Sequence, residues 1–359
     1  MAVTIHDVAR AAGVSVKTVS RAMNDHPDVS ATTREVVRET ARTLGYRPNP
    51  AARGLRTGST GMIALLVPDI LNPHFAELAR HLQAFARAEG RVSVLSSYDS
   101  NPELATAVVR SFIDHRVDGL VWMTETIPAA AWDALVAAEL PAVISGGFVP
   151  EGVDHIRSVR GHTYDAYERA TYAAAEYLIG LGHQELAYVA ESPHLASVQA
   201  RISGFRQALA DHALPTGAGL IWNQARPELH TSELGYQAVH ELLADGHRPT
   251  AICASSDTVA TGVLRALHER KLAVPADVSV VGHDGTWQAA YASPPMTTLQ
   301  TPYEAWCKTA LALLRHLIEP VGPEPASEAG FTLVVRESTG PAPTRGGRAR
   351  HLTKGGGAP

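Results

Sequence analysis

Two successive runs of alternating strand-type and helix-type segments, beginning at Met62, constrain the fold of this chain most strongly. Short apolar stretches predict strands, and longer amphipathic stretches predict the helices between them. The expected strands are 62–67, 92–97, 119–123, 142–145, 186–190, 220–222, 251–253 and 278–281. The expected helices are 73–89, 102–115, 128–138, 164–181, 197–212, 231–243 and 258–270. Because strands joined by helices run parallel, we expect an α/β body whose parallel sheets are covered on both faces.

The number of these units indicates two doubly wound lobes. A helix at 303–318 and a strand at 330–335 come late and are expected to complete the sheets after the chain crosses back. The resulting division is a head at 1–46, a hinge or linker at 47–60, a two-lobed body at 61–340 and a tail at 341–359. Lobe 1 would take about 61–161 and 303–326, and lobe 2 about 162–300 and 327–340. The tail is rich in Pro, Gly and Arg, a composition typical of disorder.

The first two dozen residues contain two short amphipathic segments on either side of Gly13. Gly13 stands where the first helix must end, and Ser15 can begin the second by accepting a hydrogen bond from a free backbone N–H group. This layout is typical of a helix-turn-helix. The polar face of the second helix suits base edges and phosphates, and it carries Lys17, Thr18, Ser20 and Arg21. An ordinary helical hairpin with a solvated polar face would show the same pattern.

A third helix is expected at 31–44, where Val37, Ala41 and Leu44 would pack on the first two helices. The charge distribution favours a nucleic-acid partner for this head. Residues 1–60 hold nine Lys and Arg against five Asp and Glu, which gives this segment a net charge of +4. Since the whole chain has a net charge of −5, the remaining residues have a net charge of −9. A basic head on an acidic body is typical of a domain that meets phosphates.

The composition argues against several other classes of protein. No apolar run reaches about 18 residues, so a membrane span is not expected. The N-terminus lacks the layout of a signal peptide, and we expect the chain to stay in the cytoplasm. Cys253 and Cys307 each lie in an apolar segment and are expected to be reduced core thiols. No cofactor or metal is expected.

Four stretches of the sequence together resemble the lactose-repressor family of bacterial transcription regulators. They are TIHDVARAAGVSVKTVSRAMN at 4–24, RPNPAARGL at 47–55, LGHQELA at 181–187, and DVSVVGHD at 277–284 with PPMTT at 294–298. The resemblance runs from about residue 3 to about residue 338. It implies a DNA-binding head, a hinge, and a body similar to periplasmic sugar-binding proteins, with a ligand held in the cleft between two lobes.

At the matching positions, the resemblance assigns Val16, Lys17 and Arg21 to base contacts in the major groove. Arg21 is the strongest of these candidates because its planar fork can hold guanine O6 and N7 together. The alternative for Lys17 is a solvated charge. The family's linker folds into a hinge helix in the minor groove, where Leu55 would wedge between base pairs and kink the duplex. The expected DNA-binding residues are Thr4, Ser15, Val16, Lys17, Thr18, Ser20, Arg21, Asn24, Asn49, Ala52, Arg53 and Leu55.

The cleft of such a body is lined by loops at the carboxyl ends of parallel strands. Arg201 and Asp284 match the family's effector arginine and carboxylate, which can clamp adjacent hydroxyls of a ligand. The alternative for both is a salt bridge at the surface or between the lobes. Phe75 would pack on a sugar face, or else belong to the core. The expected effector-binding residues are Asn72, His74, Phe75, Met123, Ser145, Asp165, Ser197, Arg201, His230, Ser256, Asp257, Asp284 and Tyr303.

Several positions depart from the family pattern and leave the ligand open. Asp165 only approximates the family's Asp-Asn pair, and Ser145 begins a stretch that replaces an acid of some members. Met123 stands where some members place a polar group, and His230 where several place an aromatic one. A neutral mono- or disaccharide is the favoured effector, ahead of a purine-like one. Because the tail lacks leucine heptads, we expect a two-fold dimer on a near-palindromic site.

The layout therefore predicts a repressor that leaves double-stranded operator DNA when a small sugar binds between the lobes. One alternative is a regulator that needs a co-repressor and takes a non-sugar effector. A sugar receptor or an enzyme with a similar α/β body is an alternative of a different class. The sequence shows neither a Gly-rich phosphate loop nor a metal-spaced His/Cys set, and a receptor would have no DNA-binding head.

Overall fold

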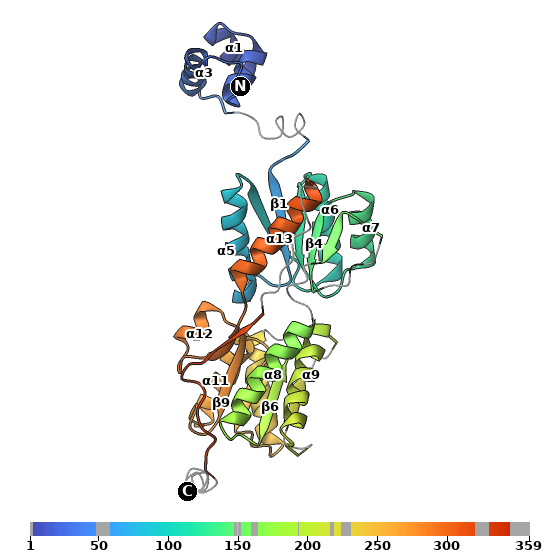
Figure 1. Cartoon of the computed structure of the whole chain (residues 1–359), viewed down its shortest axis with the longest axis vertical. Helices are drawn as coiled ribbons and strands as arrows, with labels where there is room; N and C mark the ends of the chain where they lie inside the picture. Colours follow the sequence, from blue (N-terminus) through green and yellow to red (C-terminus); the bar gives the residue numbers. More distant parts are fainter. Residues whose placement is uncertain are drawn as a thin grey trace, which may run out of the picture. The chain divides into compact units, whose positions relative to one another are not determined.

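The computed structural model describes residues 3–47, 58–146, 149, 152–158, 164–192, 194–215, 219–223, 231–319 and 330–344 (Figure 1). The chain divides into two compact units, Met1–Gly61 and Met62–Pro359. Among the described residues, no helix is long and apolar enough to cross a membrane. Over the same ranges, no group of three or more His, Cys, Asp or Glu side chains is placed to hold a metal ion.

The first unit is a helical head that consists of α1 (Ile5–Ala12), α2 (Val16–Met23) and α3 (Ala31–Thr43). Gly13 ends α1 with a φ of 66°, in the left-handed region that glycine adopts without strain. Ser15 and Ser30 begin α2 and α3, each accepting a hydrogen bond of 3.1 Å from the backbone N–H three residues later. The predicted helix-turn-helix geometry is confirmed.

The core of the head is formed by one fully buried valine from each helix, Val8, Val19 and Val37. The expectation that Leu44 packs with them is wrong, because this side chain is 37% exposed. Leu44 is the residue after the last turn of α3 and precedes Gly45, whose φ of 69° turns the chain away.

The first sheet of the body is parallel throughout, in the order β2-β1-β3-β4-β5. Its strands are β1 (Met62–Val67), β2 (Val92–Ser97), β3 (Gly119–Met123), β4 (Ala142–Ser145) and β5 (Ile156–Ser158). Its helices are α5 (Pro73–Ala88), α6 (Pro102–Asp114), α7 (Ala129–Ala137) and the late α13 (Tyr303–Ile318). One face is covered by α5 and α13, which lie side by side, and the other by α6 and α7 (Figure 1). This sheet and its helices form lobe 1.

The second sheet has the order β11-β10-β9-β8-β6-β7 and forms lobe 2 with its helices. Its strands are β6 (Leu186–Ala190), β7 (Gly219–Asn223), β8 (Ala251–Ala254), β9 (Ser279–Asp284), β10 (Thr297–Gln300) and β11 (Thr332–Val334). Its helices are α8 (Tyr164–Gly180), α9 (Ala196–Asp211), α10 (Thr231–Ala244), α11 (Asp257–Glu269) and the short α12 (Trp287–Tyr291). α8 and α9 cover one face, and α10 and α11 cover the other. Every strand pair is parallel except β10–β11, which is antiparallel.

The order of the elements confirms the predicted α/β fold with two sheets. The late helix α13 returns to lobe 1, and the late strand β11 returns to lobe 2. Three elements were not expected from the sequence: β5, α12 and β10. β10 has no apolar run that would predict a strand. Its Thr297 and Thr298 are fully buried, and their hydroxyls make hydrogen bonds with partners far away in the chain.

The start of the predicted tail is attached to lobe 2. The Ala342 N–H donates to the Leu181 carbonyl oxygen at 2.9 Å. The buried His183 places Nε2 3.0 Å from the Gly340 carbonyl oxygen and Nδ1 3.0 Å from the Thr250 hydroxyl. Residues up to this point therefore belong to the body. The part of the tail from residue 345 onward lies outside the described residues.

Candidate nucleic-acid interface and ligand cleft

The outer face of α2 carries the side chains that the sequence analysis assigned to base contacts. Lys17 is exposed, Val16 is half-buried, and the Arg21 side chain keeps 39% of its accessible surface. Val19 lies on the opposite face of the same helix and is fully buried in the core of the head. The burial of one face thus leaves the other face available to a partner.

Four other expected DNA contacts also take part in helix ends. The Ser15 and Thr18 hydroxyls lie 2.9 Å apart at the start of α2, and Asn24 Nδ2 donates to the Ser20 carbonyl oxygen at its end (2.6 Å). The Thr4 hydroxyl donates to the carboxylate three residues later in the first turn of α1 (2.7 Å). These groups fix the two helices. A phosphate contact from any of them would be additional to that role.

Most arginines in the described part of the head lie close to a carboxylate of the head itself. The pairs are Arg10–Asp7 (3.4 Å), Arg38–Asp25 (2.7 Å) and Arg42–Glu39 (2.8 Å). Arg21 Nη1 lies 3.4 Å from Asp28 Oδ2, and both side chains are exposed, so this contact is weak. Lys17 has no ion-pair partner among the described residues. The positive charge of α2 is therefore available to phosphates.

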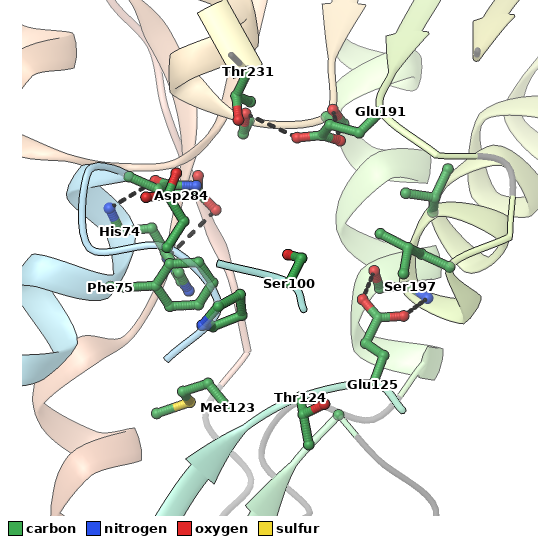
Figure 2. A pocket seen from close by; sticks show the side chains of 18 of the residues that line it. His74, Phe75, Ser100, Met123, Thr124, Glu125, Glu191, Ser197, Thr231 and Asp284 are labelled. Carbon is green, nitrogen blue, oxygen red and sulfur yellow. Dashed lines mark hydrogen bonds and ion pairs between the residues drawn. The ribbon is translucent and has the colours of Figure 1, made fainter. Parts of the chain in front are cut away.

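A cavity of about 1110 Å³ lies between the two sheets of the body. Its walls include the loops and strand ends at the carboxyl edges of β1, β2, β3 and β4 in lobe 1, and of β6, β8 and β9 in lobe 2. Ligands of open α/β sheets bind at this edge. Figure 2 shows His74, Phe75 and Asp284 on one side of the cavity, and Glu125 and Ser197 on the other.

His74 and Asp284 bring the two lobes together on the first side. His74 is in the first turn of α5, and its Nδ1 lies 3.5 Å from Asp284 Oδ1 and 3.1 Å from the Tyr303 hydroxyl. Asp284 ends β9 and is buried. Burial, and next the negative charge of Asp257, raise the pKa of the Asp284 carboxyl well above its usual range, while Arg201 counteracts part of this rise.

Arg201 lies on α9, one turn after Ser197. Its guanidinium is 4.3 Å from the centre of the Tyr167 ring, a cation–π contact, and its Nη1 donates to Ser197 Oγ at 3.3 Å. The buried Nε has no hydrogen-bond partner among the described residues. The guanidinium is thus held in place with donor capacity left for a ligand.

Two glutamates also line the cavity. Glu125 follows β3 in lobe 1, and its carboxylate accepts hydrogen bonds from the backbone N–H (2.9 Å) and the hydroxyl of Ser197 in lobe 2. Glu191 follows β6 and accepts from the Ser255 hydroxyl (2.5 Å) and the Ser256 hydroxyl (3.4 Å). With Asp284, these side chains surround the cavity with hydrogen-bond acceptors.

The structure brings nine of the expected effector residues to this cavity: Asn72, His74, Phe75, Met123, Ser145, Ser197, Arg201, Ser256 and Asp284. Tyr303 does not line it but lies behind His74. Asp257 does not line it either, because its carboxylate accepts hydrogen bonds from the Thr286 N–H (2.7 Å) and the Thr298 hydroxyl (2.5 Å). Outside the described residues lie the Asp165 side chain, His230, Asn49, Ala52, Arg53 and Leu55.

Several lining residues were not expected from the sequence, among them Glu125, Glu191, Tyr98, Tyr167 and Trp306. Both glutamates follow closely after strands that the sequence predicted correctly, and this position was a readable signal. The aromatic residues lie on or beside elements where an apolar side chain is expected in the core anyway. Their sequence positions could not separate the two roles.

Comparison with known proteins places this geometry in a family. Residues 4–49 match the model of bacterial regulatory proteins, lacI family, and residues 175–339 match that of the periplasmic binding protein-like domain. The chain is 34% identical over 317 residues to catabolite control protein A of Priestia megaterium, covering 88% of this chain and 92% of that protein. It is 31% identical over 358 residues to the transcriptional regulator MalR of Streptomyces coelicolor (97% and 100%).

Solved structures agree with these relatives. The lac repressor dimer bound to operator and the anti-inducer ONPF has a TM-score of 0.80 at 26% identity, covering 95% of this chain and 100% of that chain. The complex of the transcriptional regulator CelR with cellobiose has a TM-score of 0.65 at 27% identity (94% and 99%). The helical head, the two α/β lobes and the cleft at their strand ends are therefore those of a lacI-family bacterial regulatory protein, and this chain belongs to that family.

Proposed function

We propose that this protein is a dimeric transcriptional repressor that leaves a near-palindromic operator when a small neutral sugar binds in the cleft. The observation that carries the proposal is a cavity lined by Phe75, Arg201 and Asp284, in a chain whose head exposes the cationic face of α2. A sugar receptor with the same two-lobed fold would not need a DNA-binding head.

On the DNA side, α2 is the recognition helix. Lys17 and Arg21 are its cations, and an arginine fork matches the O6 and N7 acceptors of guanine in the major groove. A two-fold dimer places two such helices about one helical turn of DNA apart, which requires a near-palindromic site. The lac repressor dimer in the similar structure is bound to its operator.

On the ligand side, the cavity combines an aromatic side chain with polar groups from both lobes. Phe75 offers an apolar surface to a sugar ring, while Arg201 donates and Asp284 accepts hydrogen bonds from hydroxyls. The volume of about 1110 Å³ is sufficient for a mono- or disaccharide. Similar structures include a lacI-family regulator with bound ribose and CelR with cellobiose.

The two sites are coupled through the lobes. A ligand that contacts His74 and Asp284 at once has a different affinity for each relative position of the lobes, so its binding shifts their equilibrium. Linkage then requires that ligand binding changes the affinity for the operator by the same factor as operator binding changes the affinity for the ligand. A regulator of this kind acts on chromosomal DNA in the cytoplasm and carries out no chemical conversion of its ligand.

The experiment is a thermal-shift screen of the full-length protein against neutral mono- and disaccharides, with purine bases as the non-sugar arm. Operator duplexes are first selected from a random library with the protein itself. Each compound that raises the melting temperature is then added to the protein–duplex complex. Release of the duplex by a sugar supports the proposal. Tighter binding of the duplex in the presence of a sugar indicates co-repression. If only a purine changes the binding of the duplex, the effector is a purine and not a sugar.

Turnover is followed in the same samples. Conversion of the bound sugar would overturn the assignment as a regulator without enzymatic activity. Failure to select any preferred duplex would overturn the DNA-binding function itself.

A further inference from the structure

The loop after β3 reaches from lobe 1 to the first turn of α9 in lobe 2. Glu125 in this loop accepts hydrogen bonds from both the backbone N–H and the hydroxyl of Ser197. Figure 2 shows the carboxylate pointing at Ser197, on the same side of the cavity. The two residues are 72 positions apart in the sequence, so the contact joins the lobes rather than stabilising one local turn.

The N-terminus of α9 lacks a cap of its own. Its N-cap residue is Leu195, which makes no side-chain hydrogen bond to the helix, and the first turn contains no acidic residue. The first turn of a helix presents N–H groups without intrahelical partners and a partial positive charge, both of which favour a carboxylate. Glu125 supplies that carboxylate from the other lobe.

The same corner of the cavity would otherwise suit an acidic group of a ligand. Arg201 lies one turn along α9, donates to the same Ser197 hydroxyl, and has a buried Nε without a partner among the described residues. A guanidinium next to a helix N-terminus is a strong combination for binding an anion. Glu125 already occupies the N-terminal part of this combination, at the Ser197 N–H.

The rest of the cavity wall is rich in carboxylates. Besides Glu125, the lining includes Asp69, Asp99 and Glu191, and among the described lining residues Arg201 is the only arginine or lysine. Carboxylates only accept hydrogen bonds when ionised, so they favour a ligand that donates, such as a polyol or an amine, and repel one that is negatively charged.

We propose that Glu125 acts as an internal substitute for an acidic ligand group. It bridges the lobes at the N-terminus of α9 and restricts the cleft to neutral or cationic, hydroxyl-rich ligands, excluding sugar acids and sugar phosphates. This specificity role rests on the proposed function of the cleft as an effector site. The bridging role does not, because it concerns the protein without a ligand.

The bridge is tested first, on the full-length protein alone. In Glu125→Ala, amide hydrogen exchange in the first turn of α9 should become about tenfold faster, because the Ser197 N–H loses its acceptor. The control is Glu103→Gln, which removes an exposed carboxylate from the first turn of α6, outside the cavity. Unchanged exchange in Glu125→Ala would overturn the bridge.

Specificity is tested with glucuronate, glucose 6-phosphate and inorganic phosphate as acidic probes, using calorimetry. Glu125→Ala should bind at least one of the sugar acids about tenfold more tightly than the wild type, and Glu125→Ala/Arg201→Ala should lose this gain. Equal binding of the probes by wild type and Glu125→Ala would overturn the exclusion of acids. A lack of any effect of neutral sugars on operator binding would instead count against the proposed function, so the two failures are distinguishable.

Discussion

His74 Nδ1 of lobe 1 and Asp284 Oδ1 of lobe 2 lie 3.5 Å apart at the edge of the ligand cavity. The Tyr303 hydroxyl, 3.1 Å from the same nitrogen, supports His74 from behind. On the opposite side, Glu125 and Ser197 form the second polar contact between the lobes. These two contacts between the lobes therefore lie on opposite sides of the cavity, so a ligand bound between them lies between the two lobes.

The raised pKa of the Asp284 carboxyl predicts a pH-dependent stability. An unfolded aspartate ionises at a pH of about 4. Burial and the negative charge of Asp257 favour the protonated form in the folded protein, so folding binds a proton above this pH. The contribution of Asp284 to stability is thus present below about pH 4 and is lost as the pH rises towards its folded pKa.

Asp284→Asn should remove this loss, because an amide does not ionise. Relative to the wild type, the variant should become more stable as the pH rises from 4 to 7, as measured by urea unfolding. Asp133→Asn, at an exposed position on α7, is the control and should leave the slope unchanged. Parallel stability curves for wild type and Asp284→Asn would contradict the prediction.

Arg201→Lys tests whether the shape of the guanidinium matters as well as its charge. Lysine keeps the charge but loses the planar fork that stacks on Tyr167 and donates to Ser197. We expect an effector affinity about tenfold weaker or worse, measured by calorimetry with a sugar from the screen. Arg206→Lys, at an exposed position on the same helix, should bind normally. An unchanged affinity in Arg201→Lys would remove this residue from the site.

Gly204 allows α8 and α9 to approach closely. A Cβ atom at this position would lie 2.0 Å from the Glu168 carbonyl oxygen, so the helices would have to separate. Gly204→Ala should therefore lower the free energy of unfolding by about 1–3 kcal/mol. At an uncrowded helix position, the same substitution normally raises the free energy of unfolding. At Gly180 in α8, a Cβ meets nothing within 4 Å. Gly180→Ala is the control in urea unfolding, and an equal effect of both changes would refute the close approach.

Most of the fold could be predicted from the sequence because most helices and strands have a recognisable hydrophobic pattern within their own segment. β1, β2, β3, β4 and β6 have the predicted boundaries. Four of them are largely apolar runs bounded by turn residues, and β2 (VSVLSS) begins with alternating apolar and polar residues. β10 could not be found in this way. Its buried threonines depend on Asp257, Arg336 and Ser338, which come from two other parts of the chain.

The candidate site was predictable in its location but not in its pairings. Strand ends and family positions pointed to Arg201 and Asp284, which line the cavity. No local sequence pattern indicated that hydrogen bonds within lobe 2 would occupy the Asp257 carboxylate. Nor did any indicate that Glu125 of lobe 1 would accept a hydrogen bond from Ser197 of lobe 2. Such pairings depend on how the two sheets face each other, which no short stretch of sequence encodes.

Leu55→Ala tests the hinge, which lies outside the described residues and follows from the family resemblance. An apolar wedge that unstacks a base step bends the duplex, at an unstacking cost of a few kcal/mol that wider contact offsets. The variant should bind a selected operator more weakly and without the bend, as measured by energy transfer between dyes at the duplex ends. Leu104→Ala, on α6 of the body, is the control. A normal bend in Leu55→Ala would rule out the wedge.

Arg21→Ala should abolish the preference for a selected operator while weak binding to unrelated DNA remains. A bidentate arginine–guanine contact discriminates by about 1–3 kcal/mol, whereas binding to any sequence depends on the summed phosphate contacts. Affinities for operator and scrambled duplexes are measured by fluorescence anisotropy at several salt concentrations. Arg42→Ala, which removes a cation already paired with Glu39 on α3, should keep the preference. If Arg21→Ala still discriminates between the duplexes as the wild type does, α2 does not read the operator through this residue.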